Sequence, residues 1–190
     1  MQVDFSRNNF TSLNSYKRFK RSHKTLRVLD ISNNFVRQDL SELMTNMPPN
    51  MERLVLSENQ IYGTLPESLE NLAYLRQLEL GTNMLTGELP DFSTSFPNLQ
   101  VLNLANQNRG NNTGLTGSIP ESLTNLPFLT TLNLGGNSLT STIPPLLSNL
   151  GLLKILDLSK NRLSSLIPAS LGKLDGQCLS SRLSLALNFT

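Results

Sequence analysis

The sequence predicts an α/β fold in the form of a right-handed solenoid, with a parallel sheet along its concave side and short helices or turns on its convex side. A pair of apolar residues separated by one position recurs seven times, and a polar residue, usually asparagine, follows it at a fixed distance. The apolar residues are mostly aliphatic, because aromatic residues make up 6% of the chain and tryptophan is absent. A leucine-rich composition of this kind indicates internal repetition.

The recurring segment has the pattern LxLxxNxL, and its copies follow one another at steps of 26, 25, 24, 24, 30 and 24 residues. In order, the copies are "VDFSRNNF", "LDISNNFV", "LVLSENQI", "LELGTNML", "LNLANQNR", "LNLGGNSL" and "LDLSKNRL". Only the fifth copy departs from the pattern. The copies begin at Val3, Leu29, Leu54, Leu78, Leu102, Leu132 and Leu156.

Each apolar pair predicts a short strand, because residues two apart point to the same face of a strand. Successive strands must be parallel, since the chain returns to the same end about every 24 residues. The connection between parallel strands of one sheet is expected to be right-handed. Stacked strands then form the concave sheet of a solenoid.

The asparagine of each copy is expected to lie where the chain turns inward from the strand. Its amide carries donors and an acceptor, so it can bond backbone groups of its own repeat and of the neighbouring one. In the fifth copy Gln107 occupies this position, and we expect Asn106 or Asn108 to take over the role. The predicted asparagine ladder consists of Asn8, Asn34, Asn59, Asn83, Asn137 and Asn161.

The second half of the later repeats contains the segments "IYGTLP", "LTGELP", "LTGSIP", "LTSTIP" and "LSSLIP". Proline ends local pairing, and the apolar residues that follow it at spacings of three predict a turn or two of α- or 3₁₀-helix on the convex side. The first two repeats lack this element, so their convex side is expected to be irregular.

The segment "LTGSIPESLTNLPFLTTLNLGGNSL" resembles the plant-type leucine-rich repeat found in ectodomains of receptor-like kinases, receptor-like proteins and polygalacturonase inhibitors. The resemblance covers roughly residues 1–174 and implies a leucine-rich-repeat solenoid. It also implies that the repeats bind peptides, glycans or proteins, mostly along the concave sheet and its rim, and perform no chemistry. The chain lacks the paired-cysteine caps, the transmembrane segment and the kinase motifs of that family.

The predicted organisation is a repeat region at 1–174 followed by a short segment at 175–190. That segment is either a degenerate eighth repeat, with Leu183, Leu185 and Asn188 in register, or an unrelated tail. Because neither end matches a capping segment, we expect a fragment or a diverged copy of a longer protein. No stretch fits a signal peptide, and no run of about 18 apolar residues could cross a bilayer.

Catalysis is not predicted. The chain has a single histidine, His23, and contains no HExxH, paired CxxC or phosphate-loop motif. Cys178 is the only cysteine, which excludes an intramolecular disulfide and a cysteine-based metal site. We expect no cofactor and no metal.

The candidate ligand-binding residues flank the strand leucines on the concave face or lie at its rim. They form a polar surface of mixed charge with few of the Trp, Tyr and Arg residues that dominate tight interfaces, so a simple solvated face is the alternative interpretation. The insertion "NQNRGNNTG" adds six residues at the rim of the fifth repeat, either as a binding loop or as a tolerated flexible segment. The candidates are Arg53, Glu58, Gln77, Glu79, Asn103, Asn106, Arg109, Asn133 and Asp157.

Charge is distributed unevenly, since residues 1–27 contain seven Lys/Arg and one acid, whereas the remainder contains nine Lys/Arg and thirteen acids. The basic cluster at 17–27 is either a patch for an anionic polymer or a solvated surface. Three N-glycosylation motifs, at Asn9, Asn111 and Asn188, are no more than chance predicts for this composition.

The sequence therefore predicts a non-catalytic module that binds a peptide or protein ligand, with a co-receptor as a further partner and without nucleic acid. By resemblance it belongs to a receptor-like signalling ectodomain at the cell surface, with membrane attachment only through segments that this chain does not contain. Two alternatives stay open: a secreted protein similar to polygalacturonase inhibitors, and an intracellular scaffold.

Overall fold

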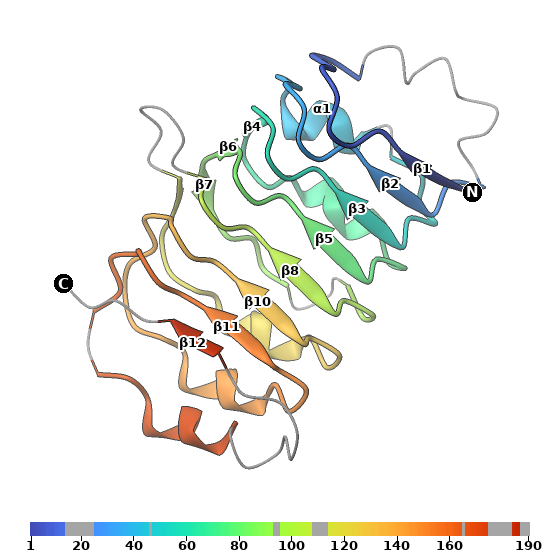
Figure 1. Ribbon diagram of the computed structural model, residues 1–190. Coiled ribbons are helices and arrows are strands. Elements are labelled where there is room, and N and C mark those ends of the chain that lie inside the picture. Colours follow the sequence, from blue (N-terminus) through green and yellow to red (C-terminus); the bar gives the residue numbers. More distant parts are fainter. Residues whose placement is uncertain are drawn as a thin grey trace.

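The computed structural model describes residues 1–13, 25–45, 47–92, 96–107, 114–164 and 166–174, and the backbone of 184–186. Its main feature is one parallel sheet whose strands follow one another in chain order along a curved stack (Figure 1). This confirms the predicted solenoid with a parallel concave sheet. The strands are β1 (Gln2–Asp4), β2 (Val28–Asp30), β3 (Arg53–Val55), β5 (Gln77–Glu79), β8 (Val101–Asn103), β10 (Thr131–Asn133), β11 (Ile155–Asp157) and β12 (Ser184–Ala186).

The strands are aligned through the first leucine of each repeat, so that Leu54 lies opposite Leu78 and Leu78 opposite Leu102. At the last strand the register differs from the degenerate repeat considered above. Leu185 lies opposite Leu156, whereas the sequence pattern places Leu183 there. The strand therefore begins two residues further along the chain than its LxL spacing predicts.

The convex side consists of α1 (Leu40–Met44) in the second repeat and of short 3₁₀-helices in later repeats: η3 (Glu67–Asn71), η4 (Glu121–Asn125), η5 (Pro145–Asn149) and η6 (Ala169–Lys173). Each 3₁₀-helix directly follows a proline at its N-cap, as the sequence predicts. The first turn of α1 is capped by Asp39, whose carboxylate accepts the Ser41 N–H at 2.8 Å.

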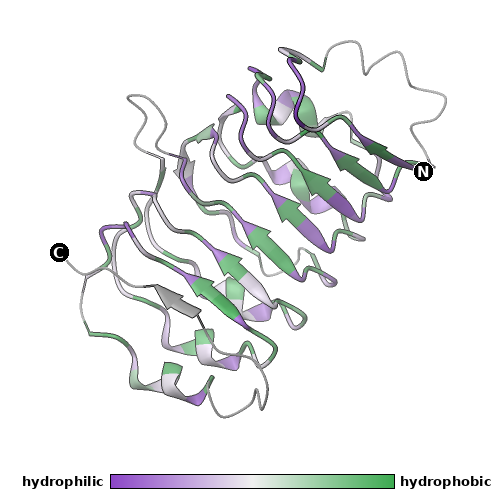
Figure 2. Cartoon of the chain, in the orientation of Figure 1, coloured by the Kyte–Doolittle hydropathy of each residue, from purple (hydrophilic) through white to green (hydrophobic). Residues whose placement is uncertain are grey.

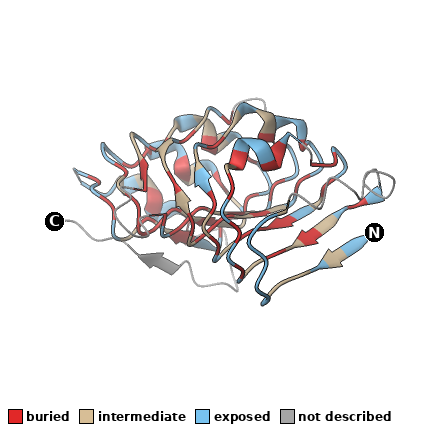
Figure 3. Cartoon of the chain, turned by 90° about the horizontal axis from the view of Figure 1, so that it is seen from above, coloured by how far each residue is buried: buried red, intermediate tan, exposed pale blue. Residues whose placement is uncertain are grey.

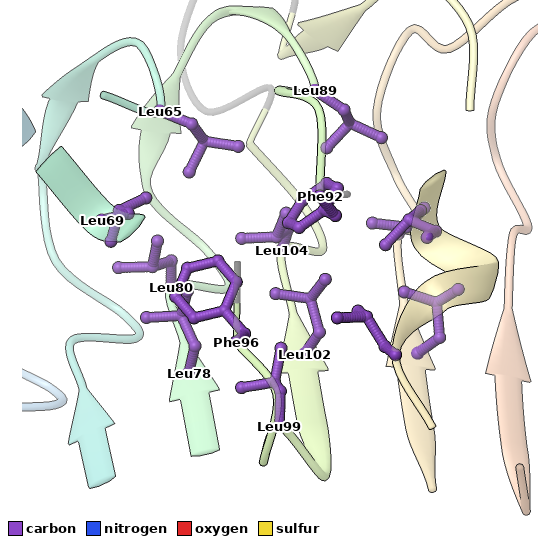
Figure 4. Packing of buried hydrophobic residues seen from close by; sticks show 14 of the residues in the cluster. Leu65, Leu69, Leu78, Leu80, Leu89, Phe92, Phe96, Leu99, Leu102 and Leu104 are labelled. Atoms are coloured by element: carbon purple, nitrogen blue, oxygen red, sulfur yellow. The ribbon is translucent and has the colours of Figure 1, made fainter. Parts of the chain in front are cut away.

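The core lies between the sheet and the convex elements. Both leucines of the LxL pair point inward, so Leu78, Leu80, Leu102 and Leu104 are at most 1% exposed. Figure 4 shows these side chains packed against residues of the convex side, among them Phe96. Figure 2 shows the resulting hydrophobic band through the middle of neighbouring strands. Since each repeat completes its core with the next repeat, a repeat cannot bury its apolar face alone.

The residues that follow the ladder position form one edge of the concave sheet, which we call the ascending rim. Here short strands pair across neighbouring repeats: β4 (Tyr62–Gly63) with β6 (Met84–Leu85), and β7 (Gly87–Glu88) with β9 (Leu115–Thr116). Neighbouring repeats are therefore paired along the rim as well as along the concave sheet, and the fourth repeat takes part in both rim pairs.

Candidate functional site

The concave face presents two rows of strand side chains. The register places Arg53 beside Gln77 in the first row, before the central leucines. In the second row, Glu79, Asn103, Asn133 and Asp157 lie side by side on β5, β8, β10 and β11. The structure therefore brings six predicted candidates together on one surface.

Most of the second row is already bonded to the backbone of its own repeat. Asn103 Oδ1 accepts the Ala105 N–H at 3.2 Å, and Asn133 Oδ1 accepts the Gly135 N–H at 3.1 Å. Asp157 Oδ1 accepts both the backbone N–H and the hydroxyl of Ser159, at 2.9 and 2.7 Å. Such side-chain-to-backbone bonds fix the turn that leaves the strand. These candidates therefore have a structural role whether or not a ligand binds.

The same pattern recurs at the N-terminal strands. Asp30 accepts from Ser32 in the same two ways, and Asp4 accepts the Ser6 N–H at 2.8 Å. This backbone hydrogen bond is the largest cause that lowers the pKa of the Asp4 carboxyl below its usual value.

Close approach between neighbouring repeats explains the small residues two positions after the second row. A Cβ atom on Gly135 would lie 2.9 Å from Asp157 Oδ1, closer than real Cβ contacts come. The carboxylate of one repeat therefore sits directly over the turn of the preceding repeat. A larger side chain at that turn would displace it.

The remaining strand candidates contact other side chains of the concave face. The Arg53 guanidinium lies 4.0 Å from Asp30 Oδ2, and the Gln77 amide donates to Glu79 Oε1. Arg53 is exposed, whereas Gln77 and Glu79 are half-buried. Because an ion pair with an exposed arginine is weak, Arg53 remains able to exchange Asp30 for a ligand.

Glu58 and Asn106 lie at the corner between the concave face and the ascending rim. Both are exposed and have left-handed backbone, with φ of 57° and 54°. The residue before the ladder position has positive φ in all seven repeats, and in the sixth it is Gly136. A Cβ on Gly136 would lie 2.2 Å from Asn106 Oδ1, so the Asn106 side chain fits only because this neighbour is glycine.

The ladder amides join adjacent repeats through the core. Asn83 Nδ2 donates to Leu56 O of the preceding repeat at 3.0 Å and to Leu80 O of its own repeat at 2.8 Å. Asn83 Oδ1 accepts the Ile61 N–H at 3.0 Å. Asn34, Asn59, Asn137 and Asn161 donate in the same way to carbonyls of their own and the preceding repeat.

In the fifth repeat the ladder position is filled by Gln107, and the expectation that Asn106 or Asn108 replaces it is wrong. Gln107 Nε2 donates to Leu80 O and Leu104 O at 2.8 and 3.2 Å, and its Oε1 accepts the Leu85 N–H at 3.3 Å. Glutamine carries the same amide on one additional methylene, and its side chain is completely buried. The ladder then continues at Asn137, so the longer repeat does not interrupt the stack.

Several candidates lie outside the described residues. These are Arg109 and most of the insertion, Lys17, Arg18, Lys20, Arg21 and Lys24 of the basic cluster, and the glycosylation motifs at Asn111 and Asn188. Arg27, at the end of the basic cluster, pairs with Glu52.

Sequence reasoning did not identify the exposed aromatic residues of the ascending rim. Phe35 and Tyr62 are 53% and 44% exposed and alternate with the buried residues Val36 and Ile61. This period-two alternation after the ladder asparagine was the available signal.

Within the described ranges, no three His, Cys, Asp or Glu side chains are grouped so that they could hold a metal ion. No helix in the described part of the chain is long and apolar enough to span a membrane.

Parallel strands aligned on LxL pairs, a buried amide ladder and a polar concave face define a leucine-rich-repeat protein. The family model described as Leucine Rich Repeat matches residues 50–72, 128–150 and 152–174. The chain belongs to this family, and its repeats are of the plant receptor-like type.

Among curated relatives, Receptor-like protein 35 of Arabidopsis thaliana is 34% identical over 108 residues, which are 57% of this chain and 11% of that protein. Receptor-like protein EIX1 of Solanum lycopersicum is 40% identical over 76 residues, 40% of this chain and 7% of that protein. The chain thus spans about a tenth of the curated relatives it matches.

Among solved structures, the Arabidopsis receptor kinase HAESA, in complex with the peptide hormone IDA and the co-receptor SERK1, superimposes with a TM-score of 0.79 at 28% identity. That match covers 99% of this chain and 30% of the other. The BIR3–SERK2 complex from Arabidopsis thaliana gives a TM-score of 0.58 at 34% identity, covering 71% of this chain and 68% of the other.

Proposed function

We propose that this chain is a recognition module of a receptor-like protein and binds a peptide or protein ligand on its concave face, with a co-receptor as a further partner. The observation that carries the proposal is the superposition of almost the whole chain on an ectodomain solved in complex with a peptide hormone and a co-receptor. The described geometry supports it, because Arg53, Gln77 and Glu79 present charge and amide groups side by side on a rigid sheet.

The module acts by binding and performs no chemistry. The sequence contains one histidine and none of the common catalytic motifs, and its relatives are receptor-like proteins. We place it at the cell surface by analogy with these relatives. Membrane attachment would come from other segments of a longer protein.

The residues available to a ligand differ from the full set of candidates. Asn103, Asn133 and Asp157 each hold a backbone N–H of their own repeat, so a ligand can use only their remaining lone pairs and donors. Arg53, Glu58 and Glu79 are free of such backbone bonds to their own turn. We therefore assign ligand contact mainly to the part of the concave face formed by β3, β5 and the corner that follows β3.

A random peptide library displayed on phage tests this proposal. Peptides are selected on the purified full chain, and their dissociation constants are measured for the double variant Arg53→Glu/Glu79→Lys. We expect the enriched peptides to bind the double variant at least about tenfold more weakly, because both substitutions reverse the charge that the peptides were selected to match. The control is Lys173→Glu, which reverses the charge of an exposed residue on the convex helix η6.

Peptides that bind the double variant as well as the wild type would contradict the assignment to the concave face. Failure to enrich any peptide over an unrelated immobilised protein would contradict the recognition function itself.

A further inference from the structure

A second surface lies on the ascending rim of the second to fourth repeats. Val36, Ile61 and Leu85 of these repeats are completely buried. Their chain neighbours point outward, because side chains alternate along extended backbone. We call the outward set the rim patch. It consists of Phe35, Arg37, Gln60, Tyr62 and Met84.

The rim patch is built on a rigid backbone. The Phe35 N–H donates to Phe10 O at 2.9 Å, and the Gln60 N–H donates to Val36 O at 3.0 Å. Tyr62 lies directly opposite Met84 in the β4–β6 pair. Side chains opposite one another on paired strands are in contact range, so Tyr62 and Met84 form one surface, and Phe35 and Arg37 lie on the rim of the preceding repeat. Figure 1 shows β4 and β6 along one edge of the concave sheet.

The composition of the rim patch is that of a protein interface. Phe, Tyr, Met and Arg are enriched at interfaces, and Tyr and Arg are frequent among residues that dominate binding energy. Phe35 is 53% and Tyr62 44% exposed, and the two lie on neighbouring repeats. The concave face has no such aromatic pair.

The repeat architecture does not require these residues. The equivalent outward positions in the sixth and seventh repeats are occupied by Ser138, Thr140, Arg162 and Ser164. The residues between them, Leu139 and Leu163, are buried aliphatic residues, as in the second to fourth repeats. Polar residues at these positions are therefore compatible with the same fold. At these outward rim positions of the described residues, aromatic side chains occur in the second and third repeats, which indicates a local role.

The rim patch contains one charged residue, Arg37. Arg37 is exposed, and among the described residues no carboxylate lies within ion-pair distance of it. Asp39, two residues along and opposite Tyr62, keeps its negative charge, but its Oδ1 already accepts the Ser41 N–H and hydroxyl. At the neighbouring corner positions, the exposed cation Arg7 of the first repeat is offset by the exposed acid Glu58 of the third, so Arg37 is the charge that the patch itself offers to a partner. A complementary partner must therefore offer a carboxylate next to apolar groups.

We propose that the rim patch binds a protein segment that presents a carboxylate beside aromatic or aliphatic side chains. The juxtaposition of Phe35, Tyr62 and Met84 supplies the apolar contact, and Arg37 supplies the charge. This surface is separate from the concave face to which we assign the ligand, so the module has two independent docking sites.

Two synthetic peptides of equal length test this assignment. They share tryptophan and leucine positions, and one carries two glutamates between them where the other carries two lysines. Their binding to the full chain is followed by tryptophan fluorescence. We expect the acidic peptide to bind at least about tenfold more tightly. Phe35→Ala should weaken it about tenfold, and Arg37→Glu should reverse the preference in favour of the basic peptide.

Arg162→Glu is the control for a rim charge reversal, because Arg162 is an exposed arginine beside the buried Leu163 of the seventh repeat, at the position that Phe35 holds in the second. The other outward rim position of that repeat holds Ser164 and not an aromatic residue. Arg53→Glu is the control for the concave face. The reversal of preference by Arg37→Glu also shows that this variant is folded. The assignment fails if the peptides bind equally, or if Arg162→Glu or Arg53→Glu changes binding as much as Arg37→Glu does. It also fails if light scattering shows a dimer that Phe35→Ala dissociates, since the occupant is then a second copy.

Discussion

The concave face and the ascending rim use their outward side chains differently. On the concave face, Asn103, Asn133 and Asp157 accept backbone N–H groups of the turns that follow their strands. On the rim, Phe35 and Tyr62 expose about half of their surface. A polar side chain on a binding face is thus not necessarily available for binding. Figure 3 illustrates the contrast between a buried interior and exposed edges, including β1 at the N-terminal end.

The largest effect expected is from the ladder, which lies between the two regions. Asn83→Leu leaves the buried Ile61 N–H without the acceptor described for it and removes one of the two amide donors to Leu56 O, the other being Asn59. We expect a loss of about 3 to 5 kcal/mol in the free energy of unfolding, measured in urea. Asn8→Leu is the control: Asn8 is exposed and donates only to Phe5 O and Ser6 O, so its loss should stay below about 1 kcal/mol. Equal losses would show that stacking of the repeats does not depend on the buried amides.

A direct comparison of the two regions uses one charged residue from each. Asp157→Ala leaves the Ser159 N–H and hydroxyl without their acceptor, and we expect a loss of about 1 to 2 kcal/mol. Arg37→Ala removes no described hydrogen bond of its side chain, and its effect should stay within about 0.5 kcal/mol. Urea unfolding of both variants decides the comparison, and a larger loss for Arg37→Ala would invert it.

The corner between the regions offers a stabilising change. Thr82 is β-branched and has a φ of 58°, a conformation that costs about 1 to 2 kcal/mol for an L-residue. Thr82→Gly should raise the melting temperature, with a net gain of about 1 kcal/mol after the entropic cost of glycine. Asn33→Gly, at the same position with a φ of 54°, should gain less because asparagine tolerates this region. A destabilised Thr82→Gly variant would indicate that the threonine side chain makes a compensating contact.

The smallest effect expected concerns two serines at equivalent positions. Ser57 Oγ is the buried side-chain atom of the described residues that lacks a partner, because Val55 stands where Asp157 stands in the seventh repeat. Ser57→Ala should therefore stabilise by about 0.5 kcal/mol, whereas Ser159→Ala should destabilise by a similar amount. Effects of the same sign in the two variants would show that the Asp157 bond contributes nothing.

The repeating part of the fold could be predicted from the sequence because its signals are local. The LxL spacing of Leu78 and Leu80 fixes both the strand and its buried face, and the proline before η3 marks the convex helix. Gln107 was missed because the pattern specifies asparagine, whereas the structure requires only an amide at this depth. The two-residue shift at Leu185 depends on pairing with β11, which spacing along the chain does not determine.

The candidate site was predictable only in part. The row formed by Glu79, Asn103 and Asn133 follows from strand alternation, so its location could be expected. The engagement of Asn103 with Ala105 depends on a side-chain rotamer and a turn, which the repeat pattern does not specify. The exposure of Phe35 depends on which residues neighbouring repeats place beside it, and this too requires the assembled solenoid.

Amide hydrogen exchange in the wild-type chain, resolved by NMR, tests most directly whether concave side chains hold the turns. The N–H groups of Ala105, Gly135 and Ser159 have Asn or Asp acceptors two residues earlier. The Ser57 N–H has Val55 at that position and serves as the internal control. We predict exchange at least about tenfold slower at the three bonded amides than at Ser57. Equal rates, or slower exchange at Ser57, would show that Asn103, Asn133 and Asp157 are not engaged and are free for a ligand.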